Sequence, residues 1–392
     1  MSNNGRPFFS RNLGLVKGTP VSLVAGGKLS GQYEDYNIGA VSVFTDRTPT
    51  SPGQVLSVAR VTKQFGQSRA GFIFTHGDPT GLTDNTVAGG DIQYRSTLFG
   101  EKPFAADLYY ERSFSSKLGN DDSYGLGLNY PNEPWGGDFI FKNIGSNFMP
   151  ALGFLNRPGI RYYEADVKHL TRYRDRSAFL RTFELETRHE IYTDLHGNLD
   201  SREDRAQVQI LTQGETSFAI EAQNSFDRVD VPFALPHNVV IPAGKYTWSS
   251  GFAHFRTSAA LPLAAHLDAW CCDYYNGSEW RVRTELFLKL SEVYEVEADY
   301  DTSFIRLPTG RVDIQIISLS GLFNFTPDMQ FAVQAQYDND SQGFGFLGRF
   351  RWEFRPGSEI LIVLGQSAVV PGTDFRFQTT QFSFRISHTL QF

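Results

Sequence analysis

The sequence predicts an all-β fold, a transmembrane antiparallel β-barrel of the outer-membrane type, and three observations support this prediction. The last residues, 380–392, alternate strictly between two faces and end on Phe392, as the closing strand of such barrels commonly does. The same period of two recurs along the whole chain. The chain is also rich in aromatic residues, yet its mean hydropathy is −0.30.

The closing segment shows the pattern most clearly, because its two faces differ chemically at every position. One face carries Phe382, Phe384, Ile386, His388, Leu390 and Phe392, and the other carries Gln381, Ser383, Arg385, Ser387, Thr389 and Gln391. A strand that spans a membrane must present apolar side chains to lipid and polar ones to the lumen. The segment therefore predicts a spanning strand.

The alternation recurs in segments long enough to cross a bilayer. In residues 278–290, Trp280, Val282 and Leu286 share one face, while charged residues occupy most of the other. Residues 294–300, 344–355 and 183–191 follow the same rule. The charged positions of these four segments predict a pore-lining set: Glu184, Glu186, Arg188, Arg281, Arg283, Glu285, Lys289, Glu295, Glu297, Asp299, Arg349, Arg351, Glu353 and Arg355.

Composition excludes the main competing classes. The 392 residues include 34 Phe and 17 Tyr, but no apolar run approaches the ~18 residues that a transmembrane helix needs. A soluble protein of this composition would have to bury many aromatic side chains, and no linker divides the chain into domains that could do so. The net charge of −7 and the lack of a basic run argue against nucleic-acid binding.

The turns predict about 22 strands, with a range of 18–22. About twenty-one candidates follow residue 21, and a further strand over residues 6–16 would give an even total. We therefore expect an N-terminal segment over residues 1–20 that includes a first strand, and a single barrel over residues 21–392. Long and short connections alternate, which places the end of the last strand in the periplasm.

Two connections near residues 136–158 and 229–244 are unusually long. The first contains an apolar stretch, Phe148-Met149-Pro150-Ala151-Leu152-Gly153-Phe154, and the second contains three prolines. Each could fold inward and cap the pore, or pack as an ordinary external loop, and the external arrangement is favoured. Aromatic residues near strand ends predict the membrane interface at Trp248, Trp270, Trp280, Trp352 and Phe392.

The search for catalytic chemistry yields no catalytic residues, no metal ligands and no cofactor site. The acidic pairs Glu184/Glu186 and Glu295/Glu297 have a spacing that a glycosidase could use. Basic neighbours would keep both members of each pair ionised, which suits a lumen wall better than a general acid. Cys271 and Cys272 are adjacent, so on a strand they would point to opposite faces, and a disulfide between them is not expected.

Several spaced motifs resemble one bacterial family. They are Pro7-Phe8-Phe9-Ser10-Arg11-Asn12-Leu13-Gly14, Gly27-Lys28-Leu29-Ser30-Gly31, the Asn147–Phe154 stretch and Arg351-Trp352-Glu353-Phe354-Arg355-Pro356-Gly357-Ser358. In this order they resemble the C-terminal β-barrel region of the domain of unknown function 5916 family, where the region usually follows a family 9-type carbohydrate-binding domain. Asn12 departs from the arginine expected there, and the carbohydrate-binding domain is not in this sequence. The resemblance implies an envelope barrel linked to carbohydrate handling.

We therefore expect a barrel of the bacterial outer membrane that acts as a pore, a transport channel or a membrane platform. Its expected partners are the lipid bilayer, the barrel-assembly machinery, and a carbohydrate or a plug or accessory protein. The first six residues lack the apolar core of a secretory signal, so the chain is a mature or shortened form, or the location is wrong. The alternatives are an envelope enzyme acting on glycan or lipid through its long loops, and a soluble β-rich binding protein.

Overall fold

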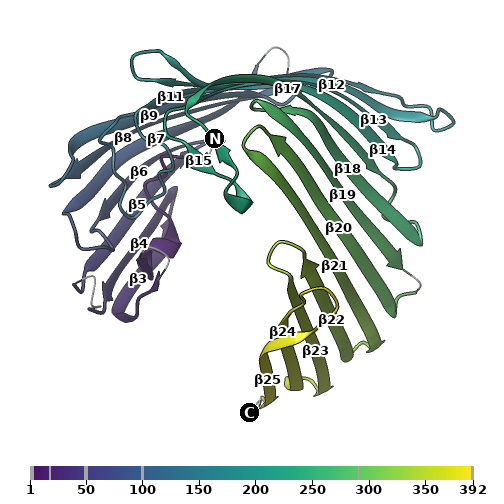
Figure 1. Cartoon of the computed structure of the whole chain (residues 1–392). Coiled ribbons are helices and arrows are strands. Elements are labelled where there is room, and N and C mark those ends of the chain that lie inside the picture. The colour runs from purple at the N-terminus through teal and green to yellow at the C-terminus, as the bar shows by residue number, and fades with distance from the viewer. Residues whose placement is uncertain (1–3, 17–18, 48–51, 99–100, 290, 390–392) are drawn as a thin grey trace. The chain divides into compact units, whose positions relative to one another are not determined.

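The computed structural model describes residues 4–16, 19–47, 52–98, 101–289 and 291–389. Within this part of the chain, 21 strands form one antiparallel sheet, in the strand order of a β-barrel (Figure 1). No helix in the described part of the chain has the length and apolar character needed to cross a membrane. The all-β fold predicted from the sequence is confirmed.

The sheet strands follow one another along the chain. They are β3 Leu23–Tyr33, β4 Tyr36–Thr45, β5 Val55–Phe65, β6 Ser68–His76, β7 Asn85–Leu98, β8 Lys102–Ser115, β9 Gly119–Tyr130, β10 Trp135–Ile144, β11 Ile160–Arg172, β12 Leu180–Asp194, β13 Leu199–Thr212, β14 Ser217–Val229, β17 Gly244–Arg256, β18 Leu263–Tyr274, β19 Gly277–Lys289, β20 Tyr294–Leu307, β21 Gly310–Thr326, β22 Met329–Asp338, β23 Gly343–Arg355, β24 Ser358–Val369 and β25 Arg376–His388. Two small ribbons, β1 Leu15–Val16 with β2 Thr19–Pro20 and β15 Phe233–Ala234 with β16 Val240–Ile241, and two 3-10 helices, η1 Ser10–Leu13 and η2 Pro236–Asn238, lie outside the sheet.

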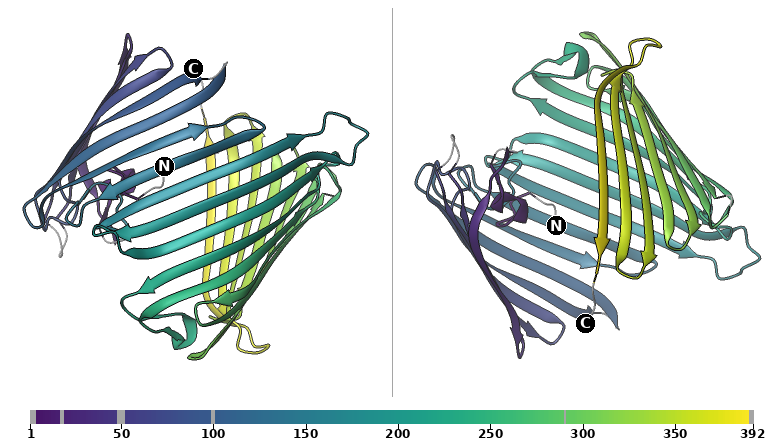
Figure 2. Two further views of the ribbon diagram at one scale, coloured as in Figure 1. Left: turned by 90° about the horizontal axis from the view of Figure 1, so that it is seen from above. Right: turned by 90° about the horizontal axis from the view of Figure 1, so that it is seen from below.

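The chain divides into two compact units. Unit 1 comprises Met1–Leu170 and Glu186–Asp204, and unit 2 comprises Thr171–Leu185 and Arg205–Phe392. Figure 2 shows that consecutive strands run side by side within each unit. The groove and the cavities described below each lie wholly within one unit.

Each strand has an apolar, exposed outer face and a more polar inner face. On β21, Ile317 and Leu319 are each 52% exposed, whereas Ser318 between them points to the opposite side. The outer face continues with large, exposed apolar side chains at Leu108, Ile220, Phe382, Phe384 and Ile386. Such a face would be unfavourable in water and is favourable against hydrocarbon, so the structure is a transmembrane β-barrel of the outer-membrane type.

The strand count of 21 lies within the predicted range, and β25 matches the predicted closing strand up to His388. Leu390 and Phe392 lie outside the described residues. The prediction of a first barrel strand over residues 6–16 is wrong. Arg6 forms an isolated bridge with Phe154, and β1 pairs with β2 in a separate ribbon, so these residues do not supply the strand that an even total requires.

The loop over residues 145–159 folds onto the inner face of unit 1. Phe148 packs in a buried cluster with Ile144 and Ile160, and Leu152 packs in a second cluster that includes Leu56. Of the two arrangements considered for this connection, the inward one is observed, and the favoured external one is wrong for it. Its limits are also narrower than predicted, because residues 136–144 belong to β10.

The N-terminal segment lies along this loop. The backbone N–H of Phe9 donates to the carbonyl of Leu152 at 2.7 Å, and Arg6 and Phe154 exchange backbone hydrogen bonds. A side chain at Gly153 would place its Cβ 1.9 Å from the Arg6 carbonyl oxygen, so this close approach requires glycine. We call residues 4–13 and 145–159 together the internal plug.

The second long connection, between β14 and β17, also packs against the sheet. Val239, which follows η2, forms a buried cluster with Ile305 of β20 and Val312 of β21. His237 of the same loop lies 2.6 Å from a carboxylate oxygen of Asp340. Ser303 of β20 lies opposite Arg281, one of the predicted pore-lining residues. Ile305 points to the same side as Ser303, because residues two apart on a strand point the same way. The loop therefore covers one end of the inner face in unit 2.

Candidate functional site

The predicted pore-lining residues of β19 and β20 share the inner face. Arg281 and Arg283 lie opposite Ser303 and Asp301 in the register of the two strands, and Arg281 contacts the Asp301 carboxylate at 2.8 Å. Other ion pairs, at 2.6–3.6 Å, join Arg283 to Glu285, Lys289 to Glu295, Arg351 to both Glu353 and Glu359, and Arg188 to both Glu186 and Asp166. Each unit therefore carries mixed charges in pairs on its inner face, and the role of these residues in lining a pore stays a prediction.

The remaining members of the predicted set also lie on these strands. Glu184 lies on the same face of β12 as Glu186, two residues further on. Glu297 and Arg349 line one cavity, and Asp299 lies opposite Glu285. Arg355 ends β23 beside the turn to β24, where it is exposed to solvent.

Two tryptophans predicted to mark the membrane interface instead face inward. Trp270 lies opposite Arg281 in the β18–β19 register, and that guanidinium lies 5.0 Å from the centroid of the indole ring. Trp248 shares this face and stacks on Tyr275 at 4.6 Å. The prediction is wrong for both because an indole with a cation or an aromatic partner is stable on the inner wall as well as at a lipid interface.

The other interface predictions have different outcomes. Trp280 is 57% exposed and Trp352 is 39% exposed. Both lie on the outer face, and their position at the membrane interface stays a prediction. Phe392 lies outside the described residues.

The expectation for the two cysteines is wrong, since a disulfide joins Cys271 to Cys272. The regular strand geometry on which that expectation rested is interrupted here. Cys272 has a φ of 100°, and the regular pairing of β18 with β19 stops at Trp270 and resumes at Asp273. The two side chains are therefore not held on opposite faces.

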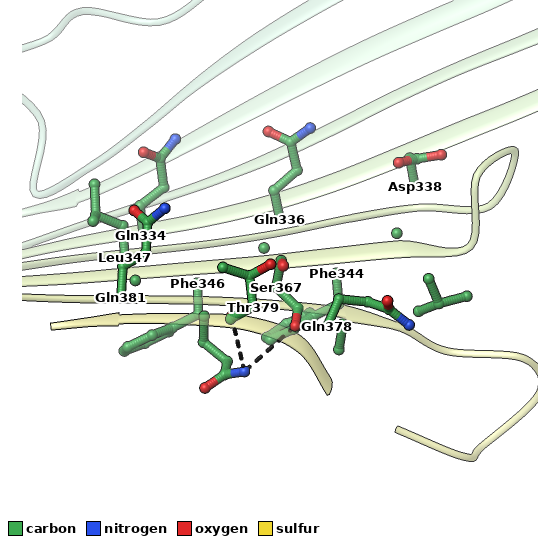
Figure 3. Close-up of a pocket in the computed structure, with 16 residues that line it drawn as sticks. Gln334, Gln336, Asp338, Phe344, Phe346, Leu347, Ser367, Gln378, Thr379 and Gln381 are labelled. Carbon is green, nitrogen blue, oxygen red and sulfur yellow. Dashed lines mark hydrogen bonds between the residues drawn. The ribbon is translucent and has the colours of Figure 1, made fainter. Parts of the chain in front are cut away.

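A groove in the inner wall of unit 2 is a candidate binding site. It has a volume of about 760 Å³ and lies over β22 to β25. Its floor consists of small residues, Gly343, Gly345, Gly365 and Ser367, and amide side chains of Gln334, Gln336 and Gln381 line it. Figure 3 shows Gln334 and Gln336 in a row with Asp338, whereas the ring of Phe346 points the other way.

Strand register explains how these residues meet. Gln334 and Gln336 of β22 lie opposite Leu347 and Gly345 of β23. Gly345 in turn lies opposite Ser367 of β24. Because cross-strand partners share a face, Gln336 lies beside Gly345 and Ser367, whereas Leu347, the partner of Gln334, lies beside Gly365. The groove lies where these positions have little or no side chain.

The groove is nearly uncharged. Among the described residues that line it, Asp338 is the single charged one, and its carboxylate accepts hydrogen bonds from the backbone and hydroxyl of Ser341 at 2.7 and 2.6 Å. Each glutamine amide offers both donors and an acceptor. The lining can therefore form hydrogen bonds with a polar solute that carries no charge.

A second cavity continues the wall toward the paired charges. It has a volume of about 480 Å³ and is lined by Glu295, Glu297 and Arg349, and it shares Gln334 and Leu347 with the groove. The inner wall of unit 2 thus passes from ionised to neutral polar side chains over neighbouring strands.

The groove was not predicted from the sequence, although the sequence contains a signal for it. The alternation over residues 331–337 assigns Gln334 and Gln336 to the polar face. Gly343 and Gly345 alternate with Phe344 and Phe346, which predicts an apolar outer face over an inner face without side chains. The proximity of these two strands, however, depends on their register.

No group of three or more metal-binding side chains that could hold an ion occurs among the described residues. The acidic pairs considered for glycosidase chemistry lie in ionic contacts. Arg188 contacts Glu186 at 3.3 Å, and Lys289 lies 3.6 Å from Glu295.

The outer apolar face, the polar inner wall and the antiparallel strand order define the class, a membrane-spanning β-barrel with a lined interior. No family model matches the sequence, and no curated protein matches it. Similar solved structures include the siderophore receptor PirA from Acinetobacter baumannii (TM-score 0.45, 9% identity, 90% of this chain and 72% of that chain). Others are the ferric-catecholate import receptor Fiu from E. coli K12 (0.40, 8%, 92% and 71%) and the copper transporter OprC (0.39, 10%, 93% and 70%).

Proposed function

We propose that this chain is a barrel of the bacterial outer membrane that binds small, neutral, polar solutes on its inner wall and lets them pass. The observation that supports this most directly is the groove over β22 to β25, which combines a floor of glycines with glutamine side chains. A solute that forms hydrogen bonds with amides at several points is held in position without the strong binding that would prevent its release.

Sugars are the solute class that fits this lining best. Their hydroxyl groups both donate and accept hydrogen bonds, as the amides of Gln334, Gln336 and Gln381 do. The resemblance to the domain of unknown function 5916 family adds independent support for a carbohydrate. The lipid bilayer, the barrel-assembly machinery and an accessory protein are the partners of this proposal, and the chain is not proposed to be an enzyme.

Filling the groove should abolish the interaction with sugar. A Cβ added at Gly345 meets nothing within 4 Å, so the Gly345→Phe variant should fold and place its ring in the groove. We expect sucrose to interrupt the single-channel current of the wild-type protein in planar bilayers. In the variant, the sucrose concentration needed for the same interruption should rise at least about tenfold, equivalent to 1.4 kcal/mol.

The matched control is Gly39→Phe on β4. Gly39 lies opposite Arg60 on the inner face of unit 1, and a Cβ there also meets nothing within 4 Å. This variant should keep the wild-type response to sucrose. A folded wild-type protein that never conducts would refute passage, and an unchanged response in Gly345→Phe would refute the role of the groove.

A further inference from the structure

A separate cavity lies in the inner wall of unit 1, beside the internal plug. Its volume is about 450 Å³, and residues 4–7 of the plug form one side of it. Side chains of β5, β7, β8 and β10 form the remainder, among them Arg60, Asp91, Asp107, Glu111 and Lys142. This volume lies in the range of sites for small molecules.

Glu111 is the unusual residue in this cavity. Glu111 is 7% exposed, and its Oε2 atom has no hydrogen-bond partner among the described residues. A buried carboxylate oxygen without a donor is costly. The cavity wall therefore contains an acceptor that lacks a donor.

The other two acids that line the cavity are already paired. Asp91 accepts from Arg60 at 2.6 Å, and Asp107 accepts from Arg95 at 2.7 Å. They leave Glu111 as the lining acid whose Oε2 atom has no donor among the described residues, and a bound ligand can supply one. An ammonium group, with three N–H donors and a positive charge, is the strongest small donor for a carboxylate.

The lining also carries positive charge. Arg6, Arg60 and Lys142 balance Asp91, Asp107 and Glu111 in formal charge, three against three. The Lys142 ammonium donates to the backbone carbonyl of Asn4 at 3.2 Å, which brings a cation to the side of the cavity that the plug forms. A ligand of net positive charge would meet these cations, whereas a ligand with both an ammonium and a carboxylate would be matched at both ends.

We propose that this cavity binds a small zwitterion, such as a free amino acid or a dipeptide, with its ammonium on Glu111 and its carboxylate toward Arg6 and Lys142. The proposal goes beyond the conduction of neutral solutes, because it concerns another unit and other residues. It does not require the barrel to conduct.

Equilibrium binding tests the proposal with the folded, detergent-solubilised full chain. Glycylglycine is titrated in a calorimeter against the wild-type protein, the isosteric Glu111→Gln variant and the Arg6→Gln variant, with heat-modifiable gel migration as the check on folding. We expect the wild-type protein to bind glycylglycine, and Glu111→Gln to weaken this binding at least about tenfold. Arg6 is exposed, so Arg6→Gln should fold, and it should weaken binding even if Glu111→Gln does not fold.

Glu295→Gln is the control, because it makes the same change on the inner wall of unit 2, and it should bind as the wild-type protein does. Ethylammonium and acetate, which carry one charged group each, should bind far more weakly than glycylglycine. The proposal is overturned if the wild-type protein does not bind glycylglycine, which would mean that water alone satisfies Glu111. Unchanged binding in folded Glu111→Gln or in Arg6→Gln, or equal binding of ethylammonium, would also overturn it.

Discussion

The Leu319→Arg variant is expected to fold poorly in lipid vesicles, with a loss of about 2–4 kcal/mol in unfolding free energy. Leu319 lies near the middle of β21, and its side chain is 52% exposed on the outer face. If that face contacts acyl chains, a guanidinium there must be removed from water without a partner. Urea titration of the barrel in phospholipid vesicles, followed by tryptophan fluorescence, measures the loss.

The neighbouring substitution Ser318→Arg provides a matched control. Ser318 lies on the inner face, opposite Asp299 of β20, and the Oδ1 atom of Asp299 has no hydrogen-bond partner among the described residues. An arginine at position 318 can donate to that carboxylate in a polar environment. We expect the free energy of unfolding of this variant to remain within about 0.5 kcal/mol of the wild-type value.

Equal losses in the two variants would contradict the assignment of faces. Leu319 and Ser318 are adjacent in sequence and receive the same side chain, so propensity and proximity to the strand ends are nearly the same. What differs between them is the face of the sheet. A large effect at Ser318 with none at Leu319 would reverse the two faces.

Period two was sufficient to predict the fold class and most of the inner wall. Arg281 and Arg283 alternate with Trp280 and Val282, and strand geometry alone converts this alternation into two faces. The ion pair between Arg281 and Asp301 required the register of β19 and β20 as well. Register depends on the turn that joins the strands, so the sequence predicted the wall but not its individual partners.

For Trp270, the alternation of polar and apolar residues predicts the face correctly, whereas the residue type alone does not. Trp270 has the same parity as His266 and Asp268, both polar, which already indicated the inner face. At this position the local alternation decides the face, and the general preference of tryptophan for the membrane interface does not. For Trp248, the neighbouring positions Tyr246 and Phe252 are aromatic too, so its face could not be inferred without the structure.

The internal plug could not be predicted from local sequence at all. Its hydrogen bonds join residues near the N-terminus to Leu152 and Phe154, far along the chain. Short-range patterns carry no information on such pairs. The strand expected over residues 6–16 was inferred from an even strand total and not from a local pattern. The apolar stretch around Phe148 indicated burial but not which side of the sheet would bury it.

Loosening the plug should enlarge the conducting path. Leu152 belongs to the plug and is fully buried against the inner wall, so Leu152→Asp places a carboxylate in an apolar cluster. The packing lost on truncating a buried leucine is worth about 2–5 kcal/mol, and the buried charge adds to this cost. Residues 145–159 are held by a few such clusters, so we expect the loop to detach while the barrel strands remain paired.

The expected result is a larger single-channel conductance and rapid cleavage of this loop by added protease, with heat-modifiable gel migration unchanged. Asn156→Asp is the control, because it introduces the same group at an exposed position of the same loop and should leave both readouts as in the wild-type protein. Leu152 contacts the sheet through Leu56 and Val58 of its cluster. The leucine therefore holds the loop against the inner face by packing alone. A folded Leu152→Asp protein with wild-type conductance and wild-type protease resistance would show that the plug neither depends on this cluster nor limits the path.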